Sequence, residues 1–351
     1  MNEFNVGAFN NALLSWYERE KRTLPWREGR DPYHIWVSEI MLQQTRVDTV
    51  IPYYENFISK FPTVTELANA DEEDVLKAWE GLGYYSRVKN LQSAVREVRT
   101  NYGGVVPNDP VEFEQLKGVG PYTKGAVMSI AYDLKVAAVD GNVMRVLARV
   151  FDIHEDISKQ KTRKKFEEIV QQMLETAPPA DFNQALMELG ALVCKPRNPD
   201  CTVCPVATEC RALQTGTVHE LPVKAKKAKP RQSGIHSAIL VDENDRVLIE
   251  KRPSTGLLAD LWQFPSVEEE KSLSAFLEER YGLKPQLQKE EETFRHVFSH
   301  LIWTVTPFTG YIDERDIPYS SKEAMWVHKD ELHRYSFPVV HQKIKKHFVG
   351  V

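Results

Sequence analysis

The chain has 351 residues and a formal net charge of −5, with 42% hydrophobic and 27% charged residues. This length exceeds the roughly 250–300 residues that one hydrophobic core usually supports, so we expect two domains. No apolar run approaches the about 18 residues of a membrane helix. The N-terminus lacks the basic and apolar regions of a secretory signal, so we expect a cytoplasmic protein, by default a monomer. A chain that is basic throughout is excluded, so any binding to nucleic acid must use a local patch.

The first predicted helix of chemical interest follows Asp31-Pro32, in the stretch DPYHIWVSEIMLQQTRVDTV. Glu39 lies within this helix, and most of its neighbours three and four positions away are apolar. A carboxyl group in such surroundings has a raised pKa, which suits a general acid. Glu39 is therefore a candidate proton donor.

Residues 113–132, FEQLKGVGPYTKGAVMSIAY, read as a helix end, a turn with two glycines and a new helix. Gly118 and Gly120 permit the positive φ angles of a tight turn, and Pro121 suits the first turn of the following helix. The N–H groups at the start of a helix can bind a phosphate. The segment is therefore predicted to be a short helical hairpin with a phosphate site.

Asp140 stands where an apolar run ends and a helix begins, in AAVDGNVMRV. Aspartate is a preferred N-cap residue, so a structural role explains this position as well as a catalytic one does. The two roles are compatible, because a carboxylate at a helix start stays ionised.

All four cysteines of the chain lie within the seventeen-residue stretch CKPRNPDCTVCPVATEC, with the spacing C-x6-C-x2-C-x5-C. Four thiolates can complete a zinc site or a [4Fe–4S] cluster. Zinc sites usually contain two close cysteine pairs, whereas this loop has one, and its prolines would hold the sulfurs apart. The spacing favours an iron–sulfur cluster held by Cys194, Cys201, Cys204 and Cys210, with zinc as the alternative.

After residue 215 the composition changes. The Lys- and Pro-rich stretch 216–232 has no apolar periodicity and reads as a linker. We therefore expect a first domain at 1–215 and a second at 233–351. In the second domain, IHSAILVDENDRVLIEKRP and RHVFSHLIWTVTPFTGYI each read as a strand pair, and KSLSAFLEERYGL reads as a helix.

Several of these segments together resemble a known family of DNA repair enzymes. The cysteine loop resembles that of the endonuclease III-type DNA glycosylases, and GVG followed by VDGNVMRVLAR matches their helix–hairpin–helix and downstream Asp. LPWR, SEIMLQQT and GLGYYSR are similar to the adenine DNA glycosylases within that superfamily. The resemblance implies an all-α helix–hairpin–helix glycosylase domain with an iron–sulfur cluster loop, followed by an α+β Nudix-like C-terminal domain.

The Nudix resemblance departs from the pattern of a metal-dependent hydrolase. AFLEERYGL keeps Glu279 and Gly282 but has Ala275, Phe276 and Arg280 where that pattern has an arginine and two glutamates. We therefore expect a recognition module derived from this fold.

The resemblance also implies a role for individual residues. The catalytic residues would be Glu39, Asp140 and Tyr122. The adenine pocket would be formed by Arg22, Trp26, Arg27, Leu42 and Val47. Gln44, Leu82 and Tyr84 would intercalate into the duplex, and the DNA backbone would be contacted at Gly118, Gly120 and Thr123. The 8-oxoguanine opposite the adenine would be recognised by Phe298, Ser299 and His300.

The implied reaction is hydrolysis of the N-glycosidic bond of adenine mispaired with 8-oxoguanine or guanine in double-stranded DNA. Bifunctional members of the superfamily carry a nucleophilic lysine where this chain has Tyr122, and a phenol cannot form a Schiff base with the sugar. The chain is therefore predicted to remove a base without a lyase step. Two alternatives stay open: an endonuclease III-like glycosylase for oxidised pyrimidines, and a non-catalytic protein that binds lesions.

Overall fold

The computed structural model describes residues 4–225, 228–313 and 323–350. The chain forms two compact units: Met1–Ala70 with Asn90–Lys226, and Asp71–Lys89 with Lys227–Val351. Residues 226 and 227 of the expected linker lie outside the described residues. The expected boundaries at 215 and 233 stay a prediction.

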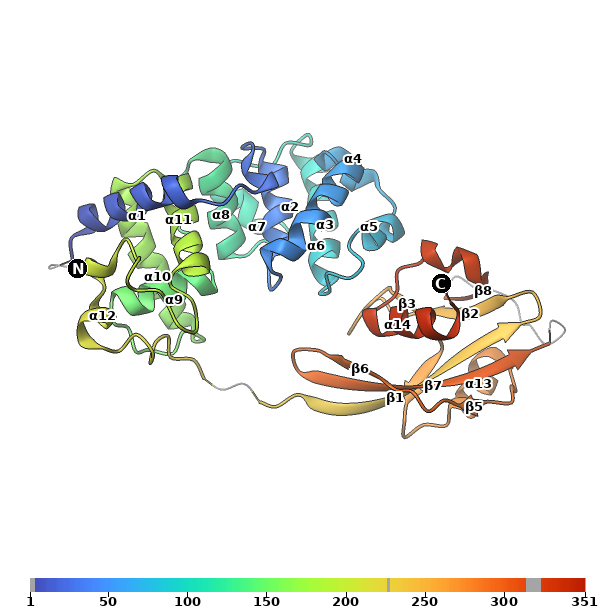
Figure 1. Ribbon diagram of the computed structural model, residues 1–351. Coiled ribbons are helices and arrows are strands. Elements are labelled where there is room, and N and C mark those ends of the chain that lie inside the picture. The colour runs from blue at the N-terminus through green and yellow to red at the C-terminus, as the bar shows by residue number, and fades with distance from the viewer. Residues whose placement is uncertain (1–3, 226–227, 314–322, 351) are drawn as a thin grey trace. The chain divides into compact units, whose positions relative to one another are not determined.

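The first unit is helical in the part of the chain that the structure describes (Figure 1). It contains α1 (Val6–Glu20), η1 (Pro25–Arg27), α2 (Pro32–Leu42), α3 (Val47–Lys60), α4 (Val64–Asn69), most of α6 (Ser86–Asn101), α7 (Pro110–Gln115), α8 (Pro121–Tyr132), α9 (Gly141–Val150), α10 (Gln160–Met173), η2 (Leu174–Thr176), α11 (Pro179–Leu192), η3 (Ala207–Glu209) and α12 (Arg211–Thr215). None of the described helices combines the length and the apolar character needed to cross a membrane.

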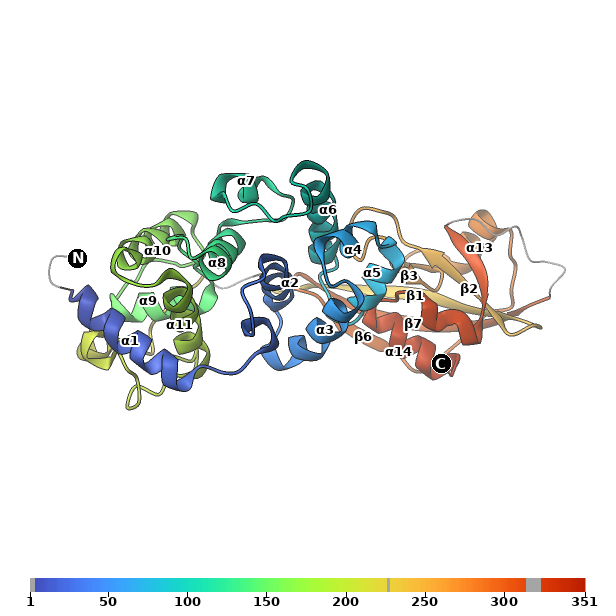
Figure 2. The same ribbon diagram turned by 90° about the horizontal axis from the view of Figure 1, so that it is seen from above.

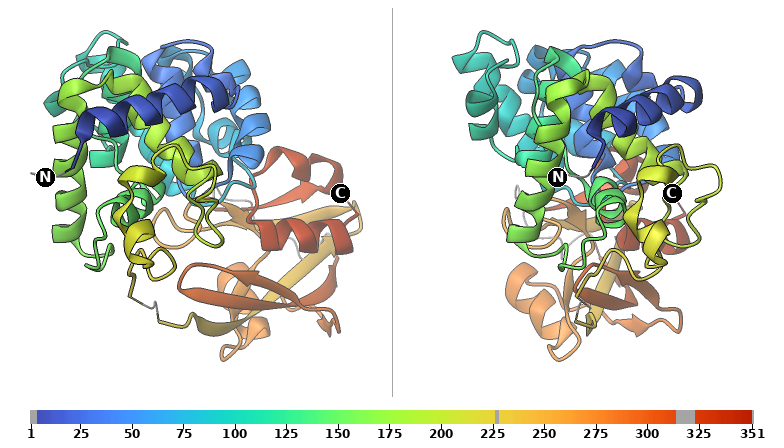
Figure 3. Two further views of the ribbon diagram at one scale, coloured as in Figure 1. Left: turned by 60° about the vertical axis from the view of Figure 1, so that its left-hand side comes forward. Right: turned by 90° about the vertical axis from the view of Figure 1, so that its left-hand side faces the viewer.

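Helix α11 is central to this unit. It packs against α1, α8 and α9, and α8 packs in turn against α2 (Figure 2). Around α11 the core contains fully buried apolar side chains, among them Phe9, Leu13, Phe166, Phe182 and Leu186. The dark blue α1 lies across the green helices in both views of Figure 3. This packing gathers α2, α8 and α9 around α11, and the candidate catalytic residues lie on α2, on α8 and at the start of α9.

The predicted helical hairpin is present as α7 and α8, with one difference in the turn. Gly118 has a φ of +81°, as expected, but Gly120 has a φ of −105° and acts as the N-cap of α8. The positive φ that a glycine permits is therefore used at Gly118 and not at Gly120. Pro121 occupies the first turn of α8, as predicted. A side chain at position 118 would also place its Cβ 2.8 Å from the Cβ of Asn90.

The stretch read as one helix after Pro32 is two helices. Asp31 caps α2 by accepting hydrogen bonds from the N–H groups of Tyr33 and His34, as its sequence position suggests. The helix ends at Leu42, and α3 begins at Val47. Gln44, in the turn between them, has a φ of +60°, which is incompatible with a continuous helix.

The second unit is built on one mixed sheet. The strands are β1 (Arg231–Asp242), β2 (Arg246–Lys251), β3 (Trp262–Gln263), β4 (Ser266–Glu268), β5 (Gln288–Lys289), β6 (Phe294–Val297), β7 (Leu301–Ile312) and β8 (Ala324–His328). Their main order is β3-β2-β1-β7-β5, with β4 on β1, β6 on β7 and β8 on β2. β1 and β7 run parallel, with Ile235 opposite Val305. Both predicted strand pairs, β1 with β2 and β6 with β7, are confirmed.

Helices cover both faces of this sheet. Along β1, Ile235 and Ile239 face the cluster that includes α14 (Val339–Phe348), whereas Ala238 and Leu240 face the cluster that includes α13 (Leu273–Tyr281). This alternation is the two-residue period of a strand that is buried on both sides. The predicted helix in this domain is α13, and η5 (Lys329–Arg334) precedes α14.

The segment Asp71–Lys89, which contains α5 (Glu72–Ala78), belongs to the second unit. The Glu73 carboxylate accepts a hydrogen bond from Trp262 Nε1 at 3.2 Å and pairs with Lys251. Glu80 Oε1 accepts the N–H of Phe337 at 2.8 Å. These long-range polar contacts explain why a segment from the first quarter of the chain groups with the C-terminal sheet.

Candidate active site and cysteine loop

Glu39 projects from α2 toward Tyr122 on α8. The Tyr122 hydroxyl donates a hydrogen bond to Glu39 Oε2 at 2.5 Å, and Glu39 is only 5% exposed. Burial raises the pKa of Glu39 to about 7, while the hydrogen bond from Tyr122 and the charge of Arg27 oppose the rise and Asp140 adds to it. The expected raised pKa is confirmed, so this carboxyl group can hold a proton near neutral pH.

Tyr122 is placed to act as a donor. Burial and the nearby Glu39 carboxylate raise the pKa of its phenol well above the usual value, so the hydroxyl stays protonated. The same hydroxyl lies 3.3 Å from Met187 Sδ on α11. Lys124, the nearest lysine along α8, instead pairs with Glu114 at 2.7 Å.

Asp140 is the N-cap of α9, as predicted. Its Oδ1 accepts the N–H of Val143 at 2.7 Å, and its Oδ2 accepts the Asn142 side-chain amide at 2.9 Å. Burial raises the pKa of Asp140, and the hydrogen bonds from Val143 and Asn142 offset part of that rise. The capping hydrogen bonds therefore favour the ionised carboxylate, as its position at a helix start suggests, while burial opposes it.

The expected adenine pocket residues fall into two groups. Trp26 is buried, with its ring 5.4 Å from that of Tyr54 in an edge-on contact, and Leu42 and Val47 are half-buried. Arg22 and Arg27 form ion pairs with Glu188, which the sequence reasoning missed.

Glu188 lies on α11 and is 1% exposed. Arg22 Nε donates to its Oε1 at 2.8 Å, and an Arg27 guanidinium nitrogen donates to its Oε2 at 2.9 Å. Burial alone would raise the pKa of Glu188, but the hydrogen bonds from both arginines lower it to about 2. The signal in the sequence was a single acidic residue inside the apolar run ALMELGAL.

Two of the three residues expected to intercalate into DNA are exposed. Gln44 and Tyr84 are accessible, and both have positive φ, +60° and +49°. Such a backbone is uncommon outside glycine, and non-glycine residues in it cluster at functional sites. Leu82 is 7% exposed and contributes to the core, so this conformation does not present it to a ligand.

The hairpin residues expected at the DNA backbone differ in what they offer. Gly118 and Gly120 form the turn before α8. The Thr123 side chain is buried, and its hydroxyl accepts a hydrogen bond from Gln43 Nε2 at 3.4 Å. Thr123 can therefore offer a phosphate its backbone N–H, in the first turn of α8, but not its side chain.

The loop Phe298–His300 joins β6 to β7. Ser299 and His300 are exposed, while the Phe298 ring packs 5.1 Å from the ring of Trp303. The Ser299 hydroxyl lies 2.7 Å from the Tyr84 hydroxyl, within hydrogen-bonding distance. The second unit therefore brings together an expected intercalating residue and an expected base-recognition residue.

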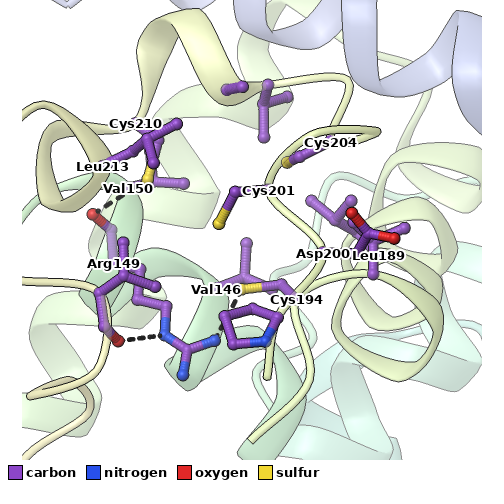
Figure 4. Close-up of a pocket in the computed structure, with 15 residues that line it drawn as sticks. Val146, Arg149, Val150, Leu189, Cys194, Asp200, Cys201, Cys204, Cys210 and Leu213 are labelled. Carbon is purple, nitrogen blue, oxygen red and sulfur yellow. Dashed lines mark hydrogen bonds between the residues drawn. The ribbon is translucent and has the colours of Figure 1, made fainter. Parts of the chain in front are cut away.

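The four cysteines line one cavity together with mainly apolar residues (Figure 4). Within the described ranges, no three or more His, Cys, Asp or Glu side chains are arranged to hold a single metal ion. The four sulfurs thus share one cavity. Burial raises the pKa of Cys204 to about 12 and also raises the pKa of Cys201 and Cys210.

Two buried arginines of α9 hold the cysteine loop, and the sequence reasoning missed both. Arg149 is 2% exposed and donates hydrogen bonds to Cys194 Sγ at 3.3 Å and to the Lys195 carbonyl at 2.8 Å. Arg145 donates to the carbonyl oxygens of Cys194 and Gly190, each at 2.8 Å. The sequence feature that could have identified them is a pair of arginines four residues apart in the mainly apolar stretch VMRVLARV.

Comparisons with known proteins agree with this architecture. Residues 37–172 match the model for the HhH-GPD superfamily base excision DNA repair protein, and residues 236–347 match the NUDIX domain. The adenine DNA glycosylase of Homo sapiens is 37% identical, over 98% of this chain and 74% of that protein. The adenine DNA glycosylase of Buchnera aphidicola subsp. Schizaphis graminum is 30% identical, over 98% of this chain and 99% of that protein.

Solved structures resemble the helical part of the chain. A thermostable thymine-DNA glycosylase is 30% identical with a TM-score of 0.55, covering 60% of this chain and 97% of that chain. A trapped endonuclease III–DNA covalent intermediate has a TM-score of 0.51 at 21% identity, covering 60% of this chain and 98% of that chain, and shows the fold alone.

Proposed function

Because the chain belongs to the adenine DNA glycosylase family, we propose that its substrate is adenine opposite 8-oxoguanine, or opposite guanine, in double-stranded DNA. The chain is a DNA glycosylase of base excision repair, a hydrolase of N-glycosyl bonds. The observation that carries the proposed substrate chemistry is the buried Glu39–Tyr122 pair, because a carboxyl group with a pKa near 7 can donate a proton to a purine leaving group.

The proposed reaction begins when the adenine nucleotide leaves the duplex and enters the pocket. Glu39 donates its proton to the base, at N7, so that adenine departs as a neutral molecule. Asp140, held at the start of α9, stabilises the positive charge that develops on the sugar. Water then adds to the sugar carbon and passes a proton to the ionised Glu39, which restores the acid and leaves an abasic site.

We propose that base removal proceeds without strand cleavage by the enzyme. A lyase step requires an amine that forms a Schiff base with the sugar. Tyr122 supplies a hydroxyl at the position where bifunctional relatives carry a lysine, and Lys124 is paired with Glu114. The Tyr122 hydroxyl on Glu39 and the pairing of Lys124 with Glu114 support a monofunctional enzyme.

The proposed recognition of the partner base uses the second unit. Ser299 can both donate and accept a hydrogen bond, so it can meet the N7–H and the O8 that oxidation gives guanine. Its position beside Tyr84 supports this role, because Tyr84 is exposed and can stack in the space next to the partner base. Ser299→Ala combined with His300→Ala is expected to reduce the ratio of adenine release opposite 8-oxoguanine to release opposite guanine. An unchanged ratio would place recognition elsewhere.

We propose that Cys194, Cys201, Cys204 and Cys210 hold a [4Fe–4S] cluster. The cavity that all four cysteines line supports a group held by the four thiolates together. Such a cluster would supply a rigid anionic core that fixes the loop, and the buried guanidinium of Arg149 beside Cys194 suits that charge. Purified protein is expected to be brown, to absorb near about 400 nm and to contain iron. Colourless protein with stoichiometric zinc would contradict the cluster.

The substrate proposal is tested with a labelled duplex that contains one adenine opposite 8-oxoguanine. After incubation with the protein, strand breaks are expected only when the products are treated with alkali. Breaks without alkali would contradict the monofunctional reaction. Binding without breaks under either condition would support the non-catalytic alternative, and release of an oxidised pyrimidine from a matched duplex that contains one, with no release of adenine, would support the endonuclease III-like one.

A further inference from the structure

Glu188 is a buried carboxylate that the family resemblance did not assign. Its oxygens accept hydrogen bonds from the backbone N–H of Arg22, from the Arg22 guanidinium and from the Arg27 guanidinium, with distances between 2.8 and 3.4 Å. The Arg22 and Arg27 side chains are 32% and 18% exposed, against 1% for Glu188. Since one carboxylate faces two guanidinium groups, this cluster carries a net positive charge of one.

The cluster is linked to the catalytic pair through two elements. α11 carries Glu188 and, one residue earlier, Met187, whose sulfur contacts the Tyr122 hydroxyl. η1 carries Arg27, and the charge of Arg27 acts on Glu39, where it favours the ionised carboxylate. The charge of Glu188 therefore influences, through Arg27, how readily Glu39 keeps its proton.

We infer that Glu188 is a positioning residue that holds Arg22 and Arg27 at the adenine pocket and balances their charge beside Glu39. This inference rests on the proposed function, because it concerns the proton that Glu39 donates to the base. Glu188 touches neither the base nor the sugar in this account. It acts through the two arginines.

Removing the charge of Glu188 has a defined consequence for Glu39. The ionisable groups that act on Glu39 are Tyr122 from α8, Asp140 at the start of α9 and Arg27 from η1. Without Glu188, the charge of Arg27 is no longer compensated, and it lowers the pKa of Glu39. A general acid works in its protonated form, so the falling limb of the pH–rate profile moves to lower pH.

The test is adenine release from a duplex with adenine opposite 8-oxoguanine, measured in single turnovers from pH 5.5 to 9. Glu188→Gln is expected to move the falling limb down by about one pH unit, which corresponds to about a tenfold loss at pH values above that limb. Glu188→Asp keeps the negative charge, so its pH–rate profile should fall at the same pH as that of the wild type. Glu18→Gln removes an exposed carboxylate, paired with Lys21, from the same part of the chain and serves as the control.

A double variant separates charge from structure. In Glu188→Gln with Arg27→Gln, the uncompensated charge next to Glu39 is gone, so the limb should return to the wild-type pH even if release stays slow. A uniformly slower Glu188→Gln enzyme with an unchanged limb would overturn the inference and leave Glu188 a structural residue. If the wild-type protein releases no adenine, the proposed function fails. If the wild-type protein releases adenine and Glu188→Gln leaves the pH of the falling limb unchanged, only the inference about Glu188 fails.

Discussion

Two glutamates of the helical unit are buried to a similar degree and have opposite pKa shifts. Glu39 is 5% exposed and has a pKa of about 7, whereas Glu188 is 1% exposed and has a pKa of about 2. The difference lies in their partners. Glu39 receives one hydrogen bond from an uncharged tyrosine, while Glu188 receives several from two guanidinium groups.

The comparison shows that burial alone does not decide what a carboxyl group can do. Desolvation raises the pKa of both residues, and only the charged partners of Glu188 reverse the direction. A buried acid with an uncharged partner keeps a proton that it can donate. A buried acid with two cationic partners stays ionised and holds its neighbours in place.

The largest expected effect concerns catalysis by Glu39. Glu39→Gln removes the transferable proton and keeps the shape of the side chain, so base release should fall by about 10²–10⁴-fold, the usual contribution of a general acid. Binding to the lesion duplex should persist. The measurement is single-turnover release of adenine together with a binding titration. Near-normal release by this variant would end the assignment of Glu39 as the acid.

A second effect distinguishes the two glutamates by pH-dependent stability. The folded pKa of Glu39 exceeds the ordinary glutamate value of 4.5, so the stability that its proton provides is lost as pH rises from about 4.5 through 7. The folded pKa of Glu188 lies below 4.5, so its contribution is present above about 4.5 and is lost as pH falls toward 2. Between pH 5 and 7, wild-type protein should lose about 2–3 kcal/mol relative to Glu39→Gln. The measurement is the free energy of urea unfolding of wild type and Glu39→Gln, plotted against pH. Parallel curves for the two proteins would contradict the prediction.

A third effect concerns stability at a fixed pH. Glu188→Gln leaves two guanidinium groups without their anionic partner, and because these arginines are partly exposed we expect a loss of about 2 kcal/mol, less than for a fully buried pair. Glu39→Gln at pH 8 should be neutral or stabilising, because it removes a buried charge. Urea unfolding of both variants at pH 8 measures their free energies of unfolding. Equal losses in the two variants would contradict the expected difference between Glu188 and Glu39.

The smallest expected effect concerns Tyr122. Its hydrogen bond lowers the pKa of Glu39, so Tyr122→Phe should raise that pKa and move the falling limb of the pH–rate profile up by about half a unit to one unit. Tyr54→Phe, which removes the hydroxyl of a tyrosine whose ring contacts Trp26, is a suitable control. A limb that moves down after Tyr122→Phe would mean that the phenol does not stabilise the carboxylate.

Much of the local structure could be predicted from short-range patterns. Asp31 and Asp140 cap helices where their sequence positions suggest, Pro121 begins a helix, and both strand pairs of the C-terminal domain form. These features depend on neighbours within a few residues. The turn around Gln44 was missed because its positive φ is rare for glutamine and leaves no mark on the apolar pattern.

The features that could not be predicted depend on distant neighbours. Glu188 meets Arg22 across 166 positions in the sequence, and Arg149 meets Cys194 across 45. Asp140 has a raised pKa because the fold buries it, whereas the sequence shows only its position at a helix start. Residue types could therefore identify candidates, but only the packing of α2, α8, α9 and α11 determined their partners and protonation.

The contrast between Glu39 and Glu188 is tested most directly by titrating the glutamate side-chain carboxyls, labelled with carbon-13, by NMR from pH 5 to 9. Each resonance is assigned by its loss in Glu39→Gln or Glu188→Gln. The Glu39 signal is expected to titrate near pH 7, and the Glu188 signal is expected to stay at its ionised position throughout. A Glu39 signal that is already ionised at pH 5, or a Glu188 signal that titrates in this range, would contradict it.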